Sequence, residues 1–123
     1  MKPPRRWSST FWYALEGIAA SLKTQRNLRV HVVAAIVVIV AAVGFKLPAR
    51  DTALLLLVIA LVISLELVNT AIEALVDLAA PGWHQLGKIA KDAAAGAVLV
   101  AAVFAVAIGI LLFYGPVIDW LGL

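Results

Sequence analysis

Residues 66–77 read E-L-V-N-T-A-I-E-A-L-V-D and directly follow an apolar run, residues 53–65. At about 100° per residue, the polar side chains of this stretch fall on one helical face. They are Glu66, Asn69, Thr70, Glu73 and Asp77. A carboxylate at the centre of a bilayer costs at least about 2.5 kcal/mol. A row of this kind at the end of a membrane helix needs water, cations or partner groups around it, so we expect chemistry there.

The composition predicts a single all-α integral membrane domain over residues 1–123. Of the 123 residues, 64% are hydrophobic and 14% are charged; a soluble domain of this size needs a more charged surface. Cysteine is absent, which excludes disulfides and thiolate metal sites. We expect no cleavable signal peptide, because no short apolar region with a cleavage site follows the basic start. Stretches of about 20 apolar residues can cross a bilayer and predict three spans, at about 28–47, 52–79 and 88–114.

The basic residues predict the orientation of these spans. Lys and Arg gather before the first span and after the second, at Lys2, Arg5, Arg6, Lys23, Arg26, Arg29, Lys88 and Lys91. The opposite side carries only Lys46 and Arg50. The positive-inside rule places the N-terminus in the cytoplasm and the C-terminus outside. No nucleic-acid partner is expected.

Before the first span, residues 7–26 show apolar side chains at helical spacing and predict an amphipathic helix in the membrane interface. Residues 8–10 (Ser-Ser-Thr) are candidate caps for its start. The polar residues 24–31 that follow suit phosphates, lipid headgroups or a metal. A solvated junction with snorkelling arginines is the alternative. Asp51 or Thr52 is a plausible cap for the second span.

Two further patterns are structural. Residues 82–88, G-W-H-Q-L-G-K, resemble the start of a P-loop, but Ile89 stands where Ser or Thr is needed and a helix replaces the preceding strand. We therefore reject a P-loop ATPase. In the third span, small residues recur at steps of four, which favours close helix packing in lipid. They are Ala93, Ala97, Ala101, Ala105 and Gly109.

The acidic face suits phosphoryl transfer. Mg²⁺ prefers carboxylate and phosphate oxygens, so Glu73 near the cytoplasmic end is a candidate ligand of a nucleotide-bound metal. Glu66 is deeper and suits a general base on an alcohol. Lys91 can neutralise a transferring phosphoryl group, and Asp92 can hold Lys91 or a ribose. The alternative is a buried polar network that fixes helix register.

The stretch 66–77, together with K-I-A-K-D-A-A-A-G-A-V-L-V at 88–100, closely resembles the prokaryotic diacylglycerol kinase family of small integral-membrane lipid kinases. The resemblance covers nearly the whole chain. It implies a homotrimer of three-span subunits in the bacterial cytoplasmic membrane, with active sites shared between neighbours and using Mg-ATP. Residues 26–31 match an R-N-x-x-x-H signature that resembles the undecaprenol kinase branch.

Carried over by position, the resemblance implies a role for each site residue. Glu66 is similar to the general base and Asn69 to its polar support. The cofactor-binding positions are Glu16, Arg26, Asn27, Asp77, Lys91 and Asp92, and the metal position is Glu73. Gln25 departs from the pattern, because many members carry an acidic second metal ligand there. An amide oxygen can still ligate Mg²⁺ but adds no negative charge.

These residues predict an ATP-dependent lipid kinase whose preferred acceptor is undecaprenol. Diacylglycerol is the alternative acceptor, since both lipids present a primary hydroxyl at the interface. A non-catalytic membrane scaffold is an alternative of another class. An ion pathway also uses intramembrane carboxylates, but it calls for acidic groups on more than one span.

Overall fold

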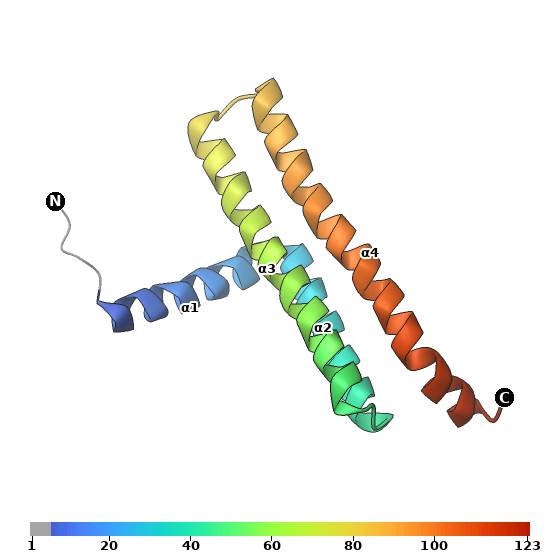
Figure 1. The fold of residues 1–123 in the computed structure, drawn as a ribbon. Coiled ribbons are helices and arrows are strands. Elements are labelled where there is room, and N and C mark those ends of the chain that lie inside the picture. The colour runs from blue at the N-terminus through green and yellow to red at the C-terminus, as the bar shows by residue number, and fades with distance from the viewer. Residues whose placement is uncertain (1–5) are drawn as a thin grey trace.

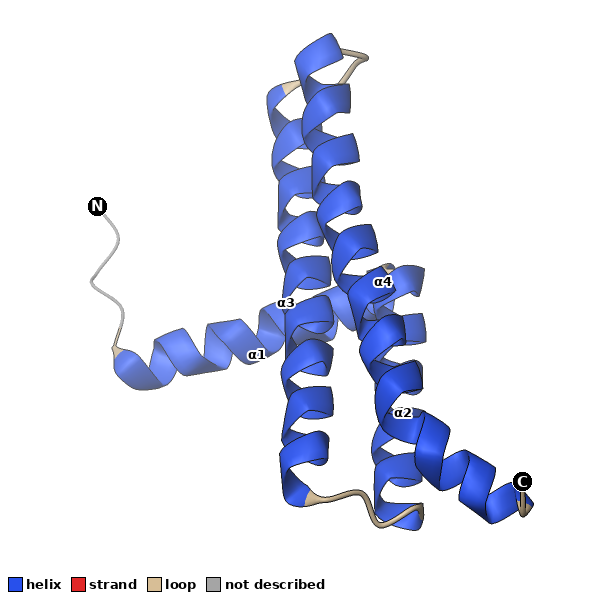
Figure 2. Ribbon diagram, turned by 45° about the vertical axis from the view of Figure 1, so that its right-hand side comes forward, coloured by secondary structure: helices blue, strands red, loops and turns tan. Residues whose placement is uncertain are grey.

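The protein folds into four helices, seen in a computed structural model that describes residues 6–123 (Figures 1 and 2). They are α1 (Trp7–Thr24), α2 (Arg26–Gly44), α3 (Ala49–Ala79) and α4 (Gln85–Leu121). Residues 6–123 contain no β-strand. The last three helices are long and apolar enough to cross a membrane. The all-α membrane class is therefore confirmed; Lys2 and Arg5 of the orientation argument lie outside the described residues.

Helix α1 begins at Trp7, as the sequence predicted, but the caps of α1 and α3 differ from the expectation, and α3 begins three residues earlier. Helix α1 begins after Arg6, with no side-chain cap, and Thr10 Oγ1 instead donates to the Arg6 carbonyl at 3.2 Å. Helix α3 begins at Ala49, directly after Pro48, again without a side-chain cap. The caps expected at residues 8–10 and at Asp51 or Thr52 are therefore wrong. Proline has its φ already fixed near the helical value and lacks an N–H, so the chain enters α3 at once.

Helix α4 is longer at both ends than expected. His84 Nδ1 accepts a hydrogen bond from the Leu86 N–H at 3.1 Å, which caps the helix start at Gln85. The helix then continues beyond residue 114 and through Pro116, and it bends near its C-terminal end (Figure 2). It ends at Gly122, whose φ of 76° is left-handed.

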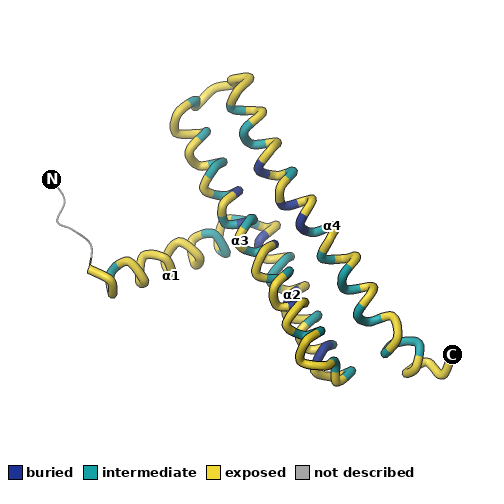
Figure 3. Tube along the Cα trace, in the orientation of Figure 1, coloured by how far each residue is buried: buried dark blue, intermediate teal, exposed yellow. Residues whose placement is uncertain are grey.

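Helix α3 is the centre of the packing. Within the described chain, α2 and α4 each pack against α3 but not against each other. The buried positions form one stripe on each helix, at a spacing of three, four or seven residues (Figure 3). They are Leu28, Ala35 and Ala42 on α2, Leu55, Val62, Glu66 and Asn69 on α3, and Ala94, Val98 and Ala101 on α4. Of the ridge of small residues expected on α4, only Ala101 lies in this packing seam.

Helix α1 crosses the other helices and meets α2 part-way along α3 (Figure 1). Leu28, with 1% of its surface exposed, is the buried residue at this junction. The 31 residues of α3 span about 46 Å, whereas the hydrocarbon core is about 30 Å thick. Helix α3 is therefore longer than a crossing of the hydrocarbon requires.

Candidate functional site

Glu66 lies in the buried stripe of α3 with only 2% of its surface exposed. Its Oε2 is 3.8 Å from Nε2 of His31 on α2, which is an ion-pair distance and too long for a hydrogen bond. Thr70 donates its hydroxyl to the Glu66 backbone carbonyl at 3.0 Å, so its side chain does not hold the carboxylate. The buried carboxylate therefore lies beside an imidazole, and no hydrogen bond to it from another side chain is seen in the described chain.

One turn further along α3, Asn69 and Glu73 are hydrogen-bonded. Asn69 Nδ2 donates to Glu73 Oε1 at 3.3 Å. Asn69 is 6% exposed, and its Oδ1 is buried without a hydrogen-bond partner in the described chain. A buried amide oxygen without a partner is costly. This oxygen and the Glu73 carboxylate are the donor types that Mg²⁺ takes, usually together with phosphate oxygens and water.

At the end of α3, Asp77 reaches across to α4. Lys91 Nζ donates to Asp77 Oδ1 at 2.6 Å, and the charge of Glu73 also attracts Lys91. Asp92 pairs instead with Lys88 on its own helix at 2.5 Å. Of the two roles expected for Asp92, holding Lys91 is not seen, because positions 88 and 92 are one helical turn apart and Lys91 faces α3; the contact with a ribose stays a prediction.

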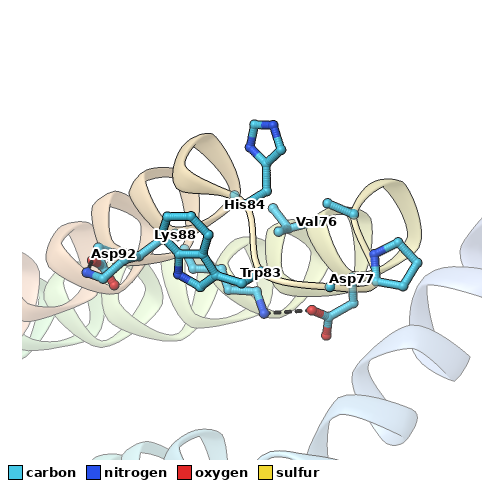
Figure 4. Close-up of a pocket in the computed structure, with 11 residues that line it drawn as sticks. Val76, Asp77, Trp83, His84, Lys88 and Asp92 are labelled. Carbon is cyan, nitrogen blue, oxygen red and sulfur yellow. Dashed lines mark hydrogen bonds and ion pairs between the residues drawn. The ribbon is translucent and has the colours of Figure 1, made fainter.

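A pocket of about 400 Å³ lies where the connection between α3 and α4 folds over these charges (Figure 4). Its polar and aromatic walls come from Asp77, Trp83, His84, Lys88, Lys91 and Asp92. Residues 82–88, which imitate the start of a P-loop, form part of its rim, but a helix rather than a strand leads into them. Two lysines beside an aromatic ring suit an anion attached to a flat ring system.

The N-terminal candidates remain apart from this group. Glu16, Arg26 and Asn27 are exposed, and Gln25 is half-buried at the junction of α1 and α2. In residues 6–123, no hydrogen bond or ion pair joins any of these four side chains to Glu73. The same part of the chain has no cluster of three His, Cys, Asp or Glu residues. The side chains of residues 6–123 therefore do not form a complete metal site of that kind.

Arg29 has a structural part that the sequence reasoning missed. Its Nη1 donates to the carbonyls of Leu22 at 2.9 Å and Lys23 at 3.0 Å. These are among the last carbonyls of α1, which have no partner within the helix. A basic residue shortly after a helix end is the signal that points to such a cap. Arg29 thus fixes the angle at which α1 leaves α2.

The family model for prokaryotic diacylglycerol kinase matches residues 12–113, most of the chain, with all of α2 and α3 and the greater part of α1 and α4. The chain belongs to the prokaryotic diacylglycerol kinase family. Members of this family are lipid kinases, and the resemblance expected from residues 66–77 and 88–100 is thereby confirmed.

Curated relatives of the family carry two different substrate names. The chain is 46% identical to a diacylglycerol kinase of Synechocystis sp. over 89% of its own length and 63% of that protein. It is 43% identical to an undecaprenol kinase of Bacillus subtilis, over 88% of each chain. A diacylglycerol kinase of Escherichia coli is 34% identical over 76% of this chain and 77% of the relative. Similarity alone leaves the acceptor lipid open.

Proposed function

We propose that this protein transfers the γ-phosphoryl group of Mg-ATP to the hydroxyl of a membrane lipid, with undecaprenol as the preferred acceptor. One observation carries the proposal: along α3, a buried carboxylate, a hydrogen-bonded amide–carboxylate pair and an interhelical lysine follow each other from the hydrocarbon outwards. A lipid hydroxyl comes from the membrane and ATP from the cytoplasm, so the two substrates meet along this row. The proposal places the N-terminus in the cytoplasm and the C-terminus outside.

In this proposal Glu66 accepts the proton of the lipid hydroxyl as the hydroxyl oxygen attacks the γ-phosphorus. A new bond forms between that oxygen and phosphorus while the bond to the bridging oxygen of ADP breaks, and ADP leaves. Lys91 stabilises the charge on the transferring group. Asn69 and Glu73 would hold Mg²⁺ beside the phosphates, and the ion supplies neutralisation of their charge. Asp77 orients Lys91 through the 2.6 Å hydrogen bond.

The remaining predicted residues belong to the nucleotide. Asp92 is proposed to face the nucleotide from the pocket that it lines. Glu16, Arg26, Asn27 and Gln25 are proposed to approach the phosphates from the N-terminal side. Because one subunit gathers few metal ligands, we propose that a homotrimer completes each site. Chemical cross-linking in detergent, followed by mass analysis, tests the trimer: a species of three chains is expected, and a monomer with full activity would exclude a shared site.

Diacylglycerol is the second candidate acceptor, and the Synechocystis and Escherichia coli relatives bear that name. The preference for undecaprenol comes from the R-N-x-x-x-H signature, whose His31 lies against Glu66. Transfer of radiolabelled phosphate from ATP to each lipid in mixed micelles tests the choice. We expect a higher kcat/KM for undecaprenol. A much higher value for diacylglycerol would reverse the preference, and no transfer to either lipid would remove the kinase function.

A further inference from the structure

A second cavity, of about 480 Å³, lies in the part of the molecule that crosses the membrane. It is a groove whose floor is α3 and whose sides are α2 and α4, and it exists because those two helices do not pack against each other. Apart from His31, all of its lining residues are apolar. The α4 side runs from Ala102 to Phe113, a distance of about 17 Å along the helix. The groove is therefore long, narrow and suited to hydrocarbon.

The two ends of this groove differ chemically. One end is His31, whose Nε2 lies 3.8 Å from Glu66 Oε2. The other end is Phe113, whose ring meets Phe45 edge to face with centroids 6.2 Å apart. Trp120 packs on the same Phe45 ring at 6.1 Å. The groove thus begins beside the proposed base and is closed by an aromatic cluster near the outer end of the bundle.

Of the six residues that α4 contributes to the groove, three are small: Ala102, Ala105 and Gly109. Ala105 and Gly109 both line it, and a Cβ added to Gly109 would meet no atom within 4 Å. Small residues on a membrane helix usually serve close helix packing. At Gly109 no other atom of the described chain lies within 4 Å of that Cβ, so this part of the ridge borders the groove and does not pack against another helix of the same chain.

We propose that this groove holds the part of the lipid alcohol's hydrocarbon tail that lies next to the hydroxyl, and that Ala105, Gly109 and Phe113 select the tails that fit. The inference rests on the proposed function, because it needs a hydroxyl at Glu66. A hydroxyl at the His31 end places the carbons next to it in the groove. The groove has room for one tail, and branching methyl groups would occupy the width left by the small residues. It therefore favours a single-tailed isoprenoid alcohol.

A helix from a second copy of the chain is a poorer occupant. Packed helices have axes 8–10 Å apart, and one lying along the whole groove would also lie against His31, which lines the groove beside Glu66. A tail instead brings its own hydroxyl to the carboxylate. The polar end of the groove thus decides between the two occupants.

The first test measures binding without catalysis. A prenol with a photoreactive diazirine in its tail is added to the protein in micelles without ATP, irradiated, and the labelled peptides are identified by mass spectrometry. We expect label on the groove-lining residues of α2 and α4, and competition by unlabelled undecaprenol. The matched variants are Ala105→Leu, which fills the groove, and Ala107→Leu, which lies two residues away on the exposed side of α4. Ala105→Leu should abolish the groove label, and Ala107→Leu should leave it unchanged.

The second test measures selectivity among tails. Ala105→Leu and Gly109→Leu are expected to lower kcat/KM for long prenols by about tenfold or more, while a prenol too short to reach residue 105 is phosphorylated as by the wild type. Phe113→Ala should raise the relative activity on long or bulky tails. Equal losses on short and long prenols would overturn the assignment, because they indicate general damage.

Two results separate this inference from its competitors and from the proposed function. The chain has no cysteine, so Ala105→Cys gives a single thiol; efficient disulfide-linked dimers through this thiol, absent for Ala107→Cys, would show that a second copy fills the groove. Label spread evenly over the lipid-facing surface of α4 would also contradict tail binding. If the wild type phosphorylates a prenol but the label is spread evenly, the kinase function stands and the assignment of the groove to the tail is wrong. If the label is confined to the groove but no phosphoryl transfer is seen, the groove binds the tail and the kinase function is wrong.

Discussion

The two halves of α3 bury opposite kinds of side chain. Before Glu66, the buried residues are Leu55 and Val62; from Glu66 onwards they are Glu66 and Asn69. Apolar burial against neighbouring helices stabilises the bundle through packing. A buried carboxylate and an unpaired amide oxygen instead cost free energy. The part of α3 before Glu66 therefore buries side chains that hold the helices together, whereas the part from Glu66 onwards buries polar groups at a cost in stability, as the proposed active site requires.

The largest effect on activity is expected for Glu66→Gln, which tests this difference between the two parts of α3. The amide keeps the size of the side chain but cannot accept a proton, so phosphoryl transfer should fall by about 10²–10⁴-fold. Thermal stability and oligomer size should hold or improve. Transfer of radiolabelled phosphate and size-exclusion chromatography measure the two effects.

Leu55→Ala is the matched control in the part of α3 before Glu66, since Leu55 is likewise 2% exposed. It should lower the unfolding temperature through lost packing and leave the rate per folded enzyme near the wild-type value. If Glu66→Gln instead loses the oligomer with little change in phosphoryl transfer, the polar residues from Glu66 onwards are a structural network, as in the scaffold alternative.

Lys91→Met tests the charges at the place where α3 ends and α4 begins. Removing the ammonium group should lower kcat by about 10²-fold, as for the loss of one stabilising donor at a transferring group. Lys88→Met removes a lysine from the same pocket, but one that pairs within its own helix at position i, i+4, so a smaller loss is expected. Steady-state kinetics against ATP measures both variants. Equal effects would show that the interhelical pair with Asp77 has no special place.

A smaller effect on stability is expected where the start of α4 approaches the end of α3. A Cβ added to Gly87 would lie 3.0 Å from Val76 Cγ1, whereas one added to Gly96 would meet nothing within 4 Å. Gly96→Ala should therefore raise stability by about 1 kcal/mol through helix propensity. Gly87→Ala should gain none of this, because the β-branched Val76 has one preferred rotamer in a helix. Thermal unfolding in detergent compares them, and equal gains would mean that the helices have room to separate.

The smallest effect is expected at the junction of α1 and α2, where Arg29 bonds the end of α1. Arg29→Ala leaves the carbonyls of Leu22 and Lys23 without their side-chain donor, at a cost of about 1 kcal/mol or less, because these groups are exposed. Hydrogen exchange should become faster at the end of α1 and stay unchanged in α3. Unchanged exchange in α1 would show that the membrane interface alone orders this helix.

The sequence predicted the membrane class, the three long helices and the interfacial helix, because these depend on hydrophobicity and periodicity along the chain. It was wrong about the helix caps at residues 8–10 and at Asp51 or Thr52, because Arg6 and Pro48 occupy the cap positions. Periodicity also placed Glu66, Asn69, Glu73 and Asp77 on one face, since that follows from a single helix. It could not pair Lys91 with Asp77 rather than with Asp92.

The sequence by itself determined what depends on neighbours in the chain: which segments are apolar, where charge interrupts them, and which polar groups share a face of α3. Only the tertiary structure decided what depends on the distance between helices. It brought His31 to Glu66, joined Lys91 to Asp77, and kept α2 and α4 apart so that a groove remains. The reason is physical: hydrophobic periodicity fixes the face that a helix buries, whereas the depth and angle at which helices meet depend on side-chain packing across all of them.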